Sequence, residues 1–187
     1  MIGNTDISWG WLAKLFHWLM FLLIVGAYVA VDQRELFEKG TAERDWWMMI
    51  HKSAGLSVFF LVWLRLGWRM SQPVPENFAG PLMSRMASIG HGLLYLLMIV
   101  VPGSALLMSQ FGGRPVSWFG LVELPVWLEA NKELAGQLKD LHAEVLAPAL
   151  FVLIIAAAYG FSAQQVEEAA KSVGYEFSGV YAPVNDN

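Results

Sequence analysis

Residues 9–31 read WGWLAKLFHWLMFLLIVGAYVAV, and Lys14 carries the only formal charge in this stretch. A hydrocarbon layer about 30 Å thick is crossed by roughly 20 consecutive apolar residues of helix. Three further stretches of similar length and character follow, at residues 46–70, 86–111 and 141–161. The sequence therefore predicts an all-α protein, a transmembrane up-down bundle of four helices.

The composition of the chain agrees with the bilayer as its solvent. Of its 187 residues, 56% are hydrophobic and 15% are charged, whereas a soluble domain carries about a quarter charged residues. There is no cysteine, which excludes disulfides, thiolate metal sites, iron–sulfur clusters and covalently attached c-type haem. The net charge is −4 without a run of Lys or Arg, so the sequence predicts no binding to nucleic acid.

We expect residues 1–163 to form one transmembrane domain and residues 164–187 to form a polar C-terminal tail. The first span lacks a basic leading segment and three more apolar spans follow it, so we predict that it is retained rather than cleaved as a signal peptide. Four crossings place both termini on one side of the membrane. The compact group of Arg65, Arg69 and Arg85 favours the cytoplasm for that side.

Tryptophans gather at the predicted helix ends, where aromatic residues mark the membrane surfaces. Trp9 and Trp11 lie at the start of the first helix, and Trp46 and Trp47 lie at the start of the second. We expect Pro102 to kink the third helix, which neighbouring helices make tolerable in lipid. The predicted connections are polar and occupy residues 32–45, 71–81 and 112–139.

The four histidines are distributed one to each predicted helix, and none lies in a connection. His17 and His91 lie near the starts of the first and third helices, on the side of the termini. His51 and His142 lie near the starts of the second and fourth helices, on the opposite side, which we call the outer side. Ionisable groups inside a membrane are costly and usually functional, so we interpret the pattern as two pairs, separated along the bundle by about 21 Å.

Two facing imidazoles at one depth are what axial ligation of haem b by two histidines requires. We therefore predict two haem b groups, an outer one between His51 and His142 and an inner one between His17 and His91. Zn²⁺ would need its four ligands together, and a proton relay would be expected to include membrane carboxylates. The alternative for any single histidine is a structural one, in which the ring bonds to a helix carbonyl or a serine.

Two other residues of the second helix have predicted roles beside these histidines. Arg65 lies 14 residues after His51 and returns to nearly the same helix face about four turns further on. It would approach the inner layer, where a guanidinium can pair with haem propionates, or else it would extend to the lipid head groups. Gly55 lies one turn after His51, where the absence of a side chain would let a flat macrocycle approach the backbone, or would serve helix packing.

From about residue 12 to about residue 163, the sequence resembles the bacterial cytochrome b-561 family of di-haem membrane proteins, and its superoxide oxidase branch most closely. The matching residues are Phe16-His17-Trp18, Met49-Ile50-His51 with Gly55, Arg65 and Arg69, Gly90-His91 with Leu94-Tyr95-Leu96-Leu97 and Pro102, Trp118-Phe119-Gly120-Leu121, and His142. The resemblance implies a protein of the bacterial inner membrane. One position departs from the family pattern, because relatives commonly carry a further histidine 14 residues after His142 and this chain has Ala156.

The resemblance implies electron transfer through the membrane. Superoxide would give up one electron at the outer haem and leave as dioxygen, and two such electrons would reduce a quinone. Positive potential draws an anionic substrate, and Lys52, Arg34 and Arg114 are the candidates for steering superoxide.

Three alternatives follow from the same residues. The outer side as a whole, including the outer ends of the spans, carries ten acidic residues against seven basic ones, which would suit a quinone-linked relay subunit that serves a dehydrogenase or a basic redox partner. Ala156 in place of histidine would also fit a chain that holds only the outer haem. A haem-depleted membrane scaffold is the third alternative.

Overall fold

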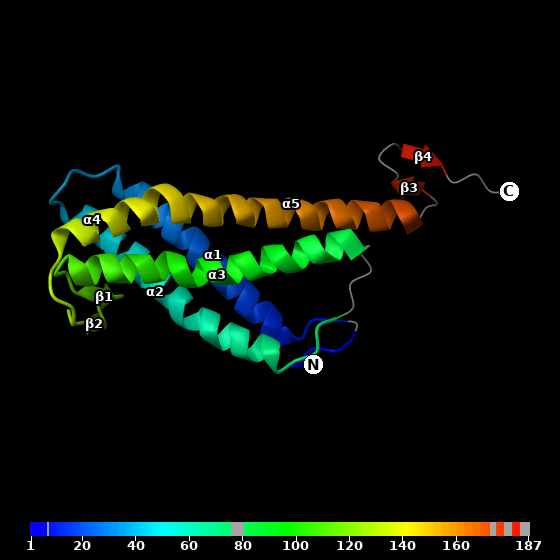
Figure 1. The fold of residues 1–187 in the computed structure, drawn as a ribbon, viewed down its shortest axis with the longest axis horizontal. Coiled ribbons are helices and arrows are strands. Elements are labelled where there is room, and N and C mark those ends of the chain that lie inside the picture. Colours follow the sequence, from blue (N-terminus) through cyan, green and yellow to red (C-terminus); the bar gives the residue numbers. More distant parts are fainter. Residues whose placement is uncertain (7, 76–80, 173–174, 178–180, 184–187) are drawn as a thin grey trace.

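Four long helices form the body of the computed structural model, which describes residues 1–6, 8–75, 81–172, 175–177 and 181–183 (Figure 1). Four helical segments in the described residues are long and apolar enough to cross a membrane, which confirms the predicted class of fold. α1 begins and the last long helix ends at the same end of the bundle (Figure 1). The helical elements are α1 (Trp11–Arg34), α2 (Ala42–Met70), α3 (Pro81–Phe111), α4 (Lys132–Asp140), the π-helix η1 (Leu141–Leu146) and α5 (Ala147–Ser172).

The second helix begins four residues before its predicted start at residue 46. Thr41 caps it by accepting a hydrogen bond from the Arg44 backbone N–H at 3.4 Å. Glu43 and Asp45 lie in its first turn, where negative charge is favourable to the helix dipole. A cap and acidic residues stabilise a helix start in water, so α2 extends beyond its apolar part.

The last span differs most from its prediction, because helical structure begins at Lys132 instead of residue 141. Asn131 caps α4 by accepting from the Leu134 N–H at 3.0 Å, and α4 continues through η1 into α5. Pro148 lies in the first turn of α5, where its ring would clash with the carbonyl four residues earlier in a regular α-helix. A wider π-turn before the proline relieves that clash, and the helix continues to Ser172, beyond the predicted end at residue 161.

Two short antiparallel hairpins lie outside the long helices. β1 (Val116–Trp118) pairs with β2 (Val122–Leu124), with Trp118 opposite Val122. β3 (Tyr175–Phe177) pairs with β4 (Tyr181–Pro183). The first hairpin falls in the stretch 112–139 that sequence analysis treated only as a polar connection. Strands of three residues are too short to show an alternating pattern.

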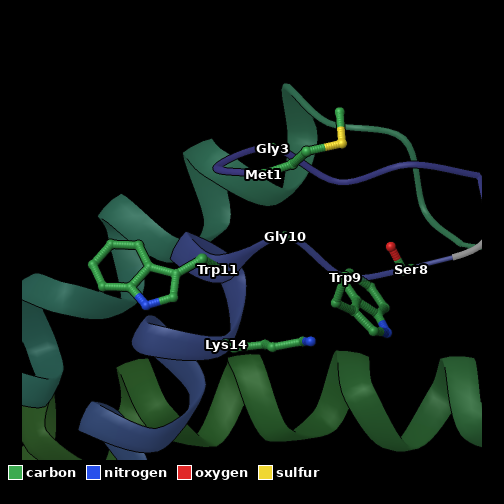
Figure 2. A pocket seen from close by; sticks show the side chains of 7 residues that line it. All are labelled: Met1, Gly3, Ser8, Trp9, Gly10, Trp11 and Lys14. Atoms are coloured by element: carbon green, nitrogen blue, oxygen red, sulfur yellow. The ribbon is translucent and has the colours of Figure 1, made fainter.

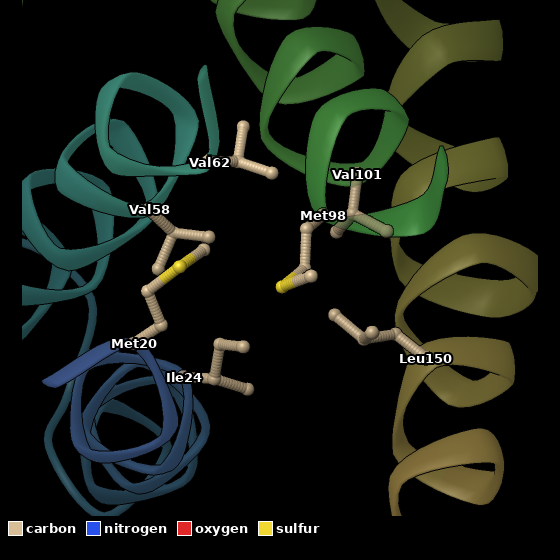
Figure 3. Packing of buried hydrophobic residues seen from close by; sticks show 7 residues of the cluster. All are labelled: Met20, Ile24, Val58, Val62, Met98, Val101 and Leu150. Carbon is tan, nitrogen blue, oxygen red and sulfur yellow. The ribbon is translucent and has the colours of Figure 1, made fainter. Parts of the chain in front are cut away.

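The apolar core lies between the long helices (Figure 3). Side chains from α1 and α2 face those from α3 and α5 across the interior (Figure 3). On α2 the cluster falls between His51 and Arg65, so it separates the two predicted histidine layers. α3 remains helical through Pro102. The buried cluster consists of Met20, Ile24, Val58, Val62, Met98, Val101 and Leu150.

The N-terminal segment folds back over the beginning of α1. The carbonyls of Met1 and Ile2 accept hydrogen bonds from the N–H groups of Trp11 and Leu12, at 3.1 and 3.4 Å, which satisfies donors that a helix start leaves unpaired. A Cβ at Gly10 would lie 2.3 Å from a backbone oxygen of this segment, so only glycine fits there. The fold leaves a small surface pocket of about 300 Å³ beside Trp11 (Figure 2).

Candidate haem-binding site

A cavity of about 750 Å³ opens near the outer end of the bundle, walled by α1, α2, α3 and the η1–α5 segment. This volume falls within the range of roughly 300–1,000 Å³ that is usual for ligand and cofactor sites. His51 on α2 and His142 on η1 both line the cavity. Two histidines that are 91 positions apart in the chain therefore meet at one site.

The rings of His51 and His142 lie 6.2 Å apart, centroid to centroid, with an angle of 88° between their planes. An imidazole nitrogen lies about 2 Å from a metal that it binds and about 1.2 Å from its own ring centre. One metal between two such nitrogens therefore sets the ring centroids roughly 6.4 Å apart. The observed separation agrees with this value, so one metal would fit between the two rings.

Backbone hydrogen bonds determine which ring nitrogens are available. His51 Nδ1 lies 2.8 Å from the carbonyl oxygen of Ala27, and His142 Nδ1 lies 2.9 Å from that of Val101. A carbonyl only accepts, so each Nδ1 carries the proton and donates it. The lone pair of each Nε2 is then available to a metal, in the second-sphere arrangement that usually supports metal-binding histidines.

The π-helix and a glycine keep the space beside these rings open. A Cβ at Gly55 would meet no atom within 4 Å, and Gly55 lines the cavity together with Ala105, Ala143 and Ala147. His142 lies within η1, and π-turns occur frequently at functional sites because they displace a side chain from its α-helical position. Small residues on three of the walls leave room for a flat cofactor.

Tyr28 connects two helices across the cavity. Its hydroxyl donates to the Ala147 carbonyl, and its ring centroid lies 5.5 Å from that of Phe151. Tyr28 also lines the cavity. Sequence analysis did not select Tyr28. No sequence pattern distinguishes a tyrosine that bonds to a neighbouring helix from one that faces lipid.

Four cations line the outer part of the same cavity. Arg34, Lys52 and Arg114 were predicted from the sequence as steering residues, and the structure brings all three to the cavity wall. Lys139 of α4 joins them. Sequence analysis did not select Lys139, because no pattern distinguishes it from the other charged residues of the stretch 112–139.

One carboxylate partly neutralises this group. Glu35 follows α1 and contacts Arg34 at 2.6 Å and Arg44 at 3.1 Å. Hydrogen bonds from Arg44 and Arg34 hold the pKa of Glu35 below its ordinary value. Arg44 is turned from the cavity, because it also donates to the carbonyl of Phe37 at 2.7 Å. Three cations at the mouth remain without an ion pair to any carboxylate of the described residues: Lys52, Arg114 and Lys139.

At the predicted inner layer, the structure brings Arg65 of α2 beside His17 of α1. Arg65 Nη2 lies 3.3 Å from His17 Nδ1, and its guanidinium lies over the Tyr95 ring at 5.5 Å. A guanidinium only donates, so Nδ1 of His17 accepts here, unlike Nδ1 of His51 and His142. His91 lies close enough to interact electrostatically with His17, and both side chains are exposed at the surface of the bundle.

Clusters that would suit other metals are absent from the described part of the chain. No group of three or more His, Asp or Glu side chains there could hold a metal ion. Zn²⁺ needs four ligands in one place. Paired histidines beside a cavity of this volume instead suit a metal that brings its own equatorial ligands, as the iron of haem does.

Comparisons with known proteins agree with this geometry. A probable superoxide oxidase, CybB, from Yersinia pestis is 32% identical over 143 residues, which cover 73% of this chain and 77% of that protein. The protein called cytochrome b561 homolog 2 of Escherichia coli is 31% identical over 148 residues, covering 72% of this chain and 74% of the relative. Cytochrome b561 homolog 1 of the same organism is 27% identical over 128 residues, covering 67% and 72%.

The family model for prokaryotic cytochrome b561 matches residues 8–164. That range includes the four spans, all four histidines and the cationic mouth of the cavity. Membership implies haem b binding and electron transport within a bacterial membrane. The chain is thus a member of the prokaryotic cytochrome b561 family, a membrane protein of electron transfer.

Proposed function

We propose that His51 and His142 are the axial ligands of a haem b that occupies the outer cavity. The 6.2 Å separation of their rings is the observation that carries this proposal, and the two Nδ1–H donors to backbone carbonyls support it. When bound, haem b takes up and releases one electron at a time. The chain would supply the ligands, the orientation of their rings and the cavity between the helices.

Arg34, Lys52, Arg114 and Lys139 would serve this site in two ways. Haem propionates are anions, and cations at the cavity mouth would pair with them. The positive potential that remains would draw a small anionic substrate towards the same mouth. Lys52 is adjacent to His51 in the chain, so its charge lies close to the proposed ligand.

The substrate that we propose is superoxide, with a quinone as acceptor. Each superoxide loses one electron and leaves as dioxygen, and a quinone takes up two electrons and two protons to give the quinol. The unpaired cations at the mouth support an anionic donor, and the probable superoxide oxidase of Yersinia pestis among the relatives supports this one.

The inner layer is proposed as a second haem b site with His17 and His91 as ligands. The only lone pair of the neutral His17 ring accepts from Arg65 here, so Arg65 would release the ring and pair with a haem propionate when the site is filled. The proximity of these three residues supports this assignment. Ala156, at the position where the family pattern carries a histidine, makes His91 the available second ligand. We place both termini on the cytoplasmic side of the inner membrane, as the grouping of Arg65, Arg69 and Arg85 predicts.

Stopped-flow mixing of the oxidised protein with superoxide tests the reaction. The haem should be reduced faster than superoxide disproportionates spontaneously, and added quinone should reoxidise it. Lys52→Gln should slow the reduction and weaken its dependence on salt, whereas Lys39→Gln, a matched change on an exposed outer connection, should not.

A relay subunit is the second candidate, supported by the acidic outer surface that includes Glu123, Glu129 and Glu133. It predicts that superoxide leaves the haem oxidised while a reduced basic redox protein reduces it. Reduction by superoxide that is no faster than spontaneous disproportionation would therefore reject the oxidase and favour the relay. A purified chain with no haem spectrum would reject both in favour of a scaffold.

A further inference from the structure

The hairpin formed by β1 and β2, residues 116–124, exposes apolar side chains at its tip. Leu121 is 78% exposed and Val122 is 55% exposed. No charged residue lies between Arg114 and Glu123. The hairpin belongs to none of the four candidate membrane spans, so the bundle itself does not explain this surface.

The turn of the hairpin adopts a strained conformation. Phe119 has φ of 51° and Gly120 has φ of 72°, and the Leu121 N–H donates to the Trp118 carbonyl at 3.0 Å. Glycine tolerates such a conformation, but a bulky aromatic residue rarely adopts it. Strain of this kind persists only where surrounding contacts enforce it, and it points to a function.

Two serines of α2 provide those contacts. The Phe119 N–H donates to Ser53 Oγ at 2.8 Å, and Trp118 Nε1 donates to Ser57 Oγ at 3.0 Å. Ser53 Oγ also lies 3.2 Å from the Ser117 carbonyl, and Ser53 is fully buried. The tip is therefore fastened to the side of α2, and the strained turn is held against that helix.

The position of these serines along α2 sets the depth of the tip. Trp46, which is half exposed, and Trp47 form the aromatic pair that marks the outer membrane surface. Ser53, which holds the backbone of the turn, lies seven residues after Trp46, which is about 10 Å along the helix axis. Ser57, which holds the Trp118 indole, lies about 16 Å after Trp46. The turn thus lies beside α2 below the level of the aromatic pair, on the hydrocarbon side of the interface.

Non-helical backbone at membrane depth must have its polar groups satisfied within the protein. The β1–β2 ladder pairs the facing edges of the two strands. In the turn, the Phe119 N–H donates to Ser53 Oγ and the Leu121 N–H donates to the Trp118 carbonyl. The side chains of the turn are apolar and uncharged, and this combination of paired turn N–H groups and apolar side chains suits lipid better than water.

The chain after the hairpin returns to the membrane surface. Gln110, almost fully buried at the end of α3, accepts from the Trp127 N–H at 2.7 Å and donates to the Pro125 carbonyl at 2.9 Å. Trp127 is 65% exposed, at the level where interfacial tryptophans gather. Residues 116–128 therefore descend from the surface and return to it.

We propose that the turn of this hairpin, residues 118–122, enters the outer leaflet, with Phe119, Leu121 and Val122 among the acyl chains and the carboxylate of Glu123 at the level of the head groups. The occupant of the exposed apolar surface is lipid. The hairpin then closes the side of the outer cavity that β1 borders, since Val116 lines that cavity. This assignment concerns the membrane and is independent of the proposed electron donor.

The absence of cysteine from the chain allows a direct test with single spin labels. Leu121→Cys carries a nitroxide at the tip, in the full-length protein reconstituted into phosphatidylcholine vesicles. Val29→Cys, on the exposed apolar face of α1, is the lipid control, and Lys39→Cys, on the exposed α1–α2 connection, is the water control. Collision with dissolved oxygen reports lipid, and collision with a water-soluble nickel chelate reports water.

The nitroxide at Leu121 should be as inaccessible to the nickel chelate as the nitroxide at Val29. Accessibility equal to that at Lys39 would overturn the proposal and would assign the patch to an aqueous partner instead. In the Leu121→Cys background, Ser53→Ala should raise nickel accessibility, whereas Ser88→Ala, a serine on α3 that bonds only within its own helix among the described contacts, should not. An unchanged tip in Ser53→Ala would refute the serine attachment.

Discussion

Gly55→Leu should separate the binding of haem from the stability of the helix. The position has no atom within 4 Å of where a Cβ would lie, so the protein without cofactor can accept the larger side chain. Replacement of a helix-interior glycine by a good helix former stabilises a helix by about 0.5–1 kcal/mol. The cofactor-free variant should therefore be as stable as the original chain, or more stable.

Haem binding should respond in the opposite direction. Gly55 lines the outer cavity, and a leucine there would occupy space that the proposed macrocycle needs. Overpacking of a filled site costs about 1–3 kcal/mol, which corresponds to an affinity about 5- to 150-fold weaker. The loss should concern the outer haem, because Gly55 lies one turn from His51.

Haem titration into the cofactor-free protein, followed by absorbance, measures this affinity, and circular dichroism on heating measures the stability. Gly67→Leu is the matched control, since Gly67 lies on the same helix, has equally open surroundings and does not line the cavity. Equal haem affinity in the two variants would refute the assignment of the cavity. Unfolding of Gly55→Leu in the absence of haem would refute the inference that the cofactor-free protein has room for a larger side chain at this position.

Three other substitutions have definite expected outcomes. Tyr28→Phe removes the hydroxyl that donates to Ala147, and it should destabilise the protein by about 0.5–1.5 kcal/mol. An unchanged thermal midpoint would show that this hydrogen bond does not contribute to stability. The pKa of Glu35 is lowered, so its ion pairs stabilise the fold above the ordinary glutamate pKa of about 4.3, and this contribution is lost as pH falls through the lowered pKa. Glu35→Gln should therefore weaken the decrease of the thermal midpoint with falling pH in the acid range. The same dependence of the midpoint on pH in both proteins would contradict this. Two opposite unit charges roughly 10 Å apart in water attract each other by about 0.4 kcal/mol. Lys139→Gln should therefore slow reduction of the haem by superoxide about twofold at low salt. A rate equal to that of the original chain at every salt concentration would show that Lys139 does not steer the substrate.

The sequence alone predicts the four spans and the meeting of His51 with His142. Long apolar runs are the strongest signal that a chain carries, and alternate crossing of the membrane fixes which helix starts lie at the same depth. The same reasoning places Arg65 near His17, because 14 residues restore the helix face, and the structure has these two side chains 3.3 Å apart.

Other features of the site depend on contacts that no local pattern reveals. The π-turn at His142 arises from the conflict between Pro148 and a regular helix. The sequence of α4 is rich in charged residues, which is typical of a connection outside the membrane, so the sequence did not predict a helix there. The hairpin has strands of three residues, and its attachment depends on Ser53 and Ser57, which are 60 or more positions from the residues they hold. Such long-range pairings appear only in the folded chain.

Electron paramagnetic resonance of the oxidised, purified protein tests the central proposal most directly. Axial imidazoles whose planes are nearly perpendicular, as the 88° between His51 and His142 requires, give low-spin ferric haem a strongly anisotropic signal with a large maximal g value. The account predicts this signal in the original chain and a decrease of its intensity by the share of the outer haem in His51→Ala, while any signal of the inner haem remains. A rhombic low-spin signal alone, or an anisotropic signal of undiminished intensity in His51→Ala, would contradict the assignment of these two ligands.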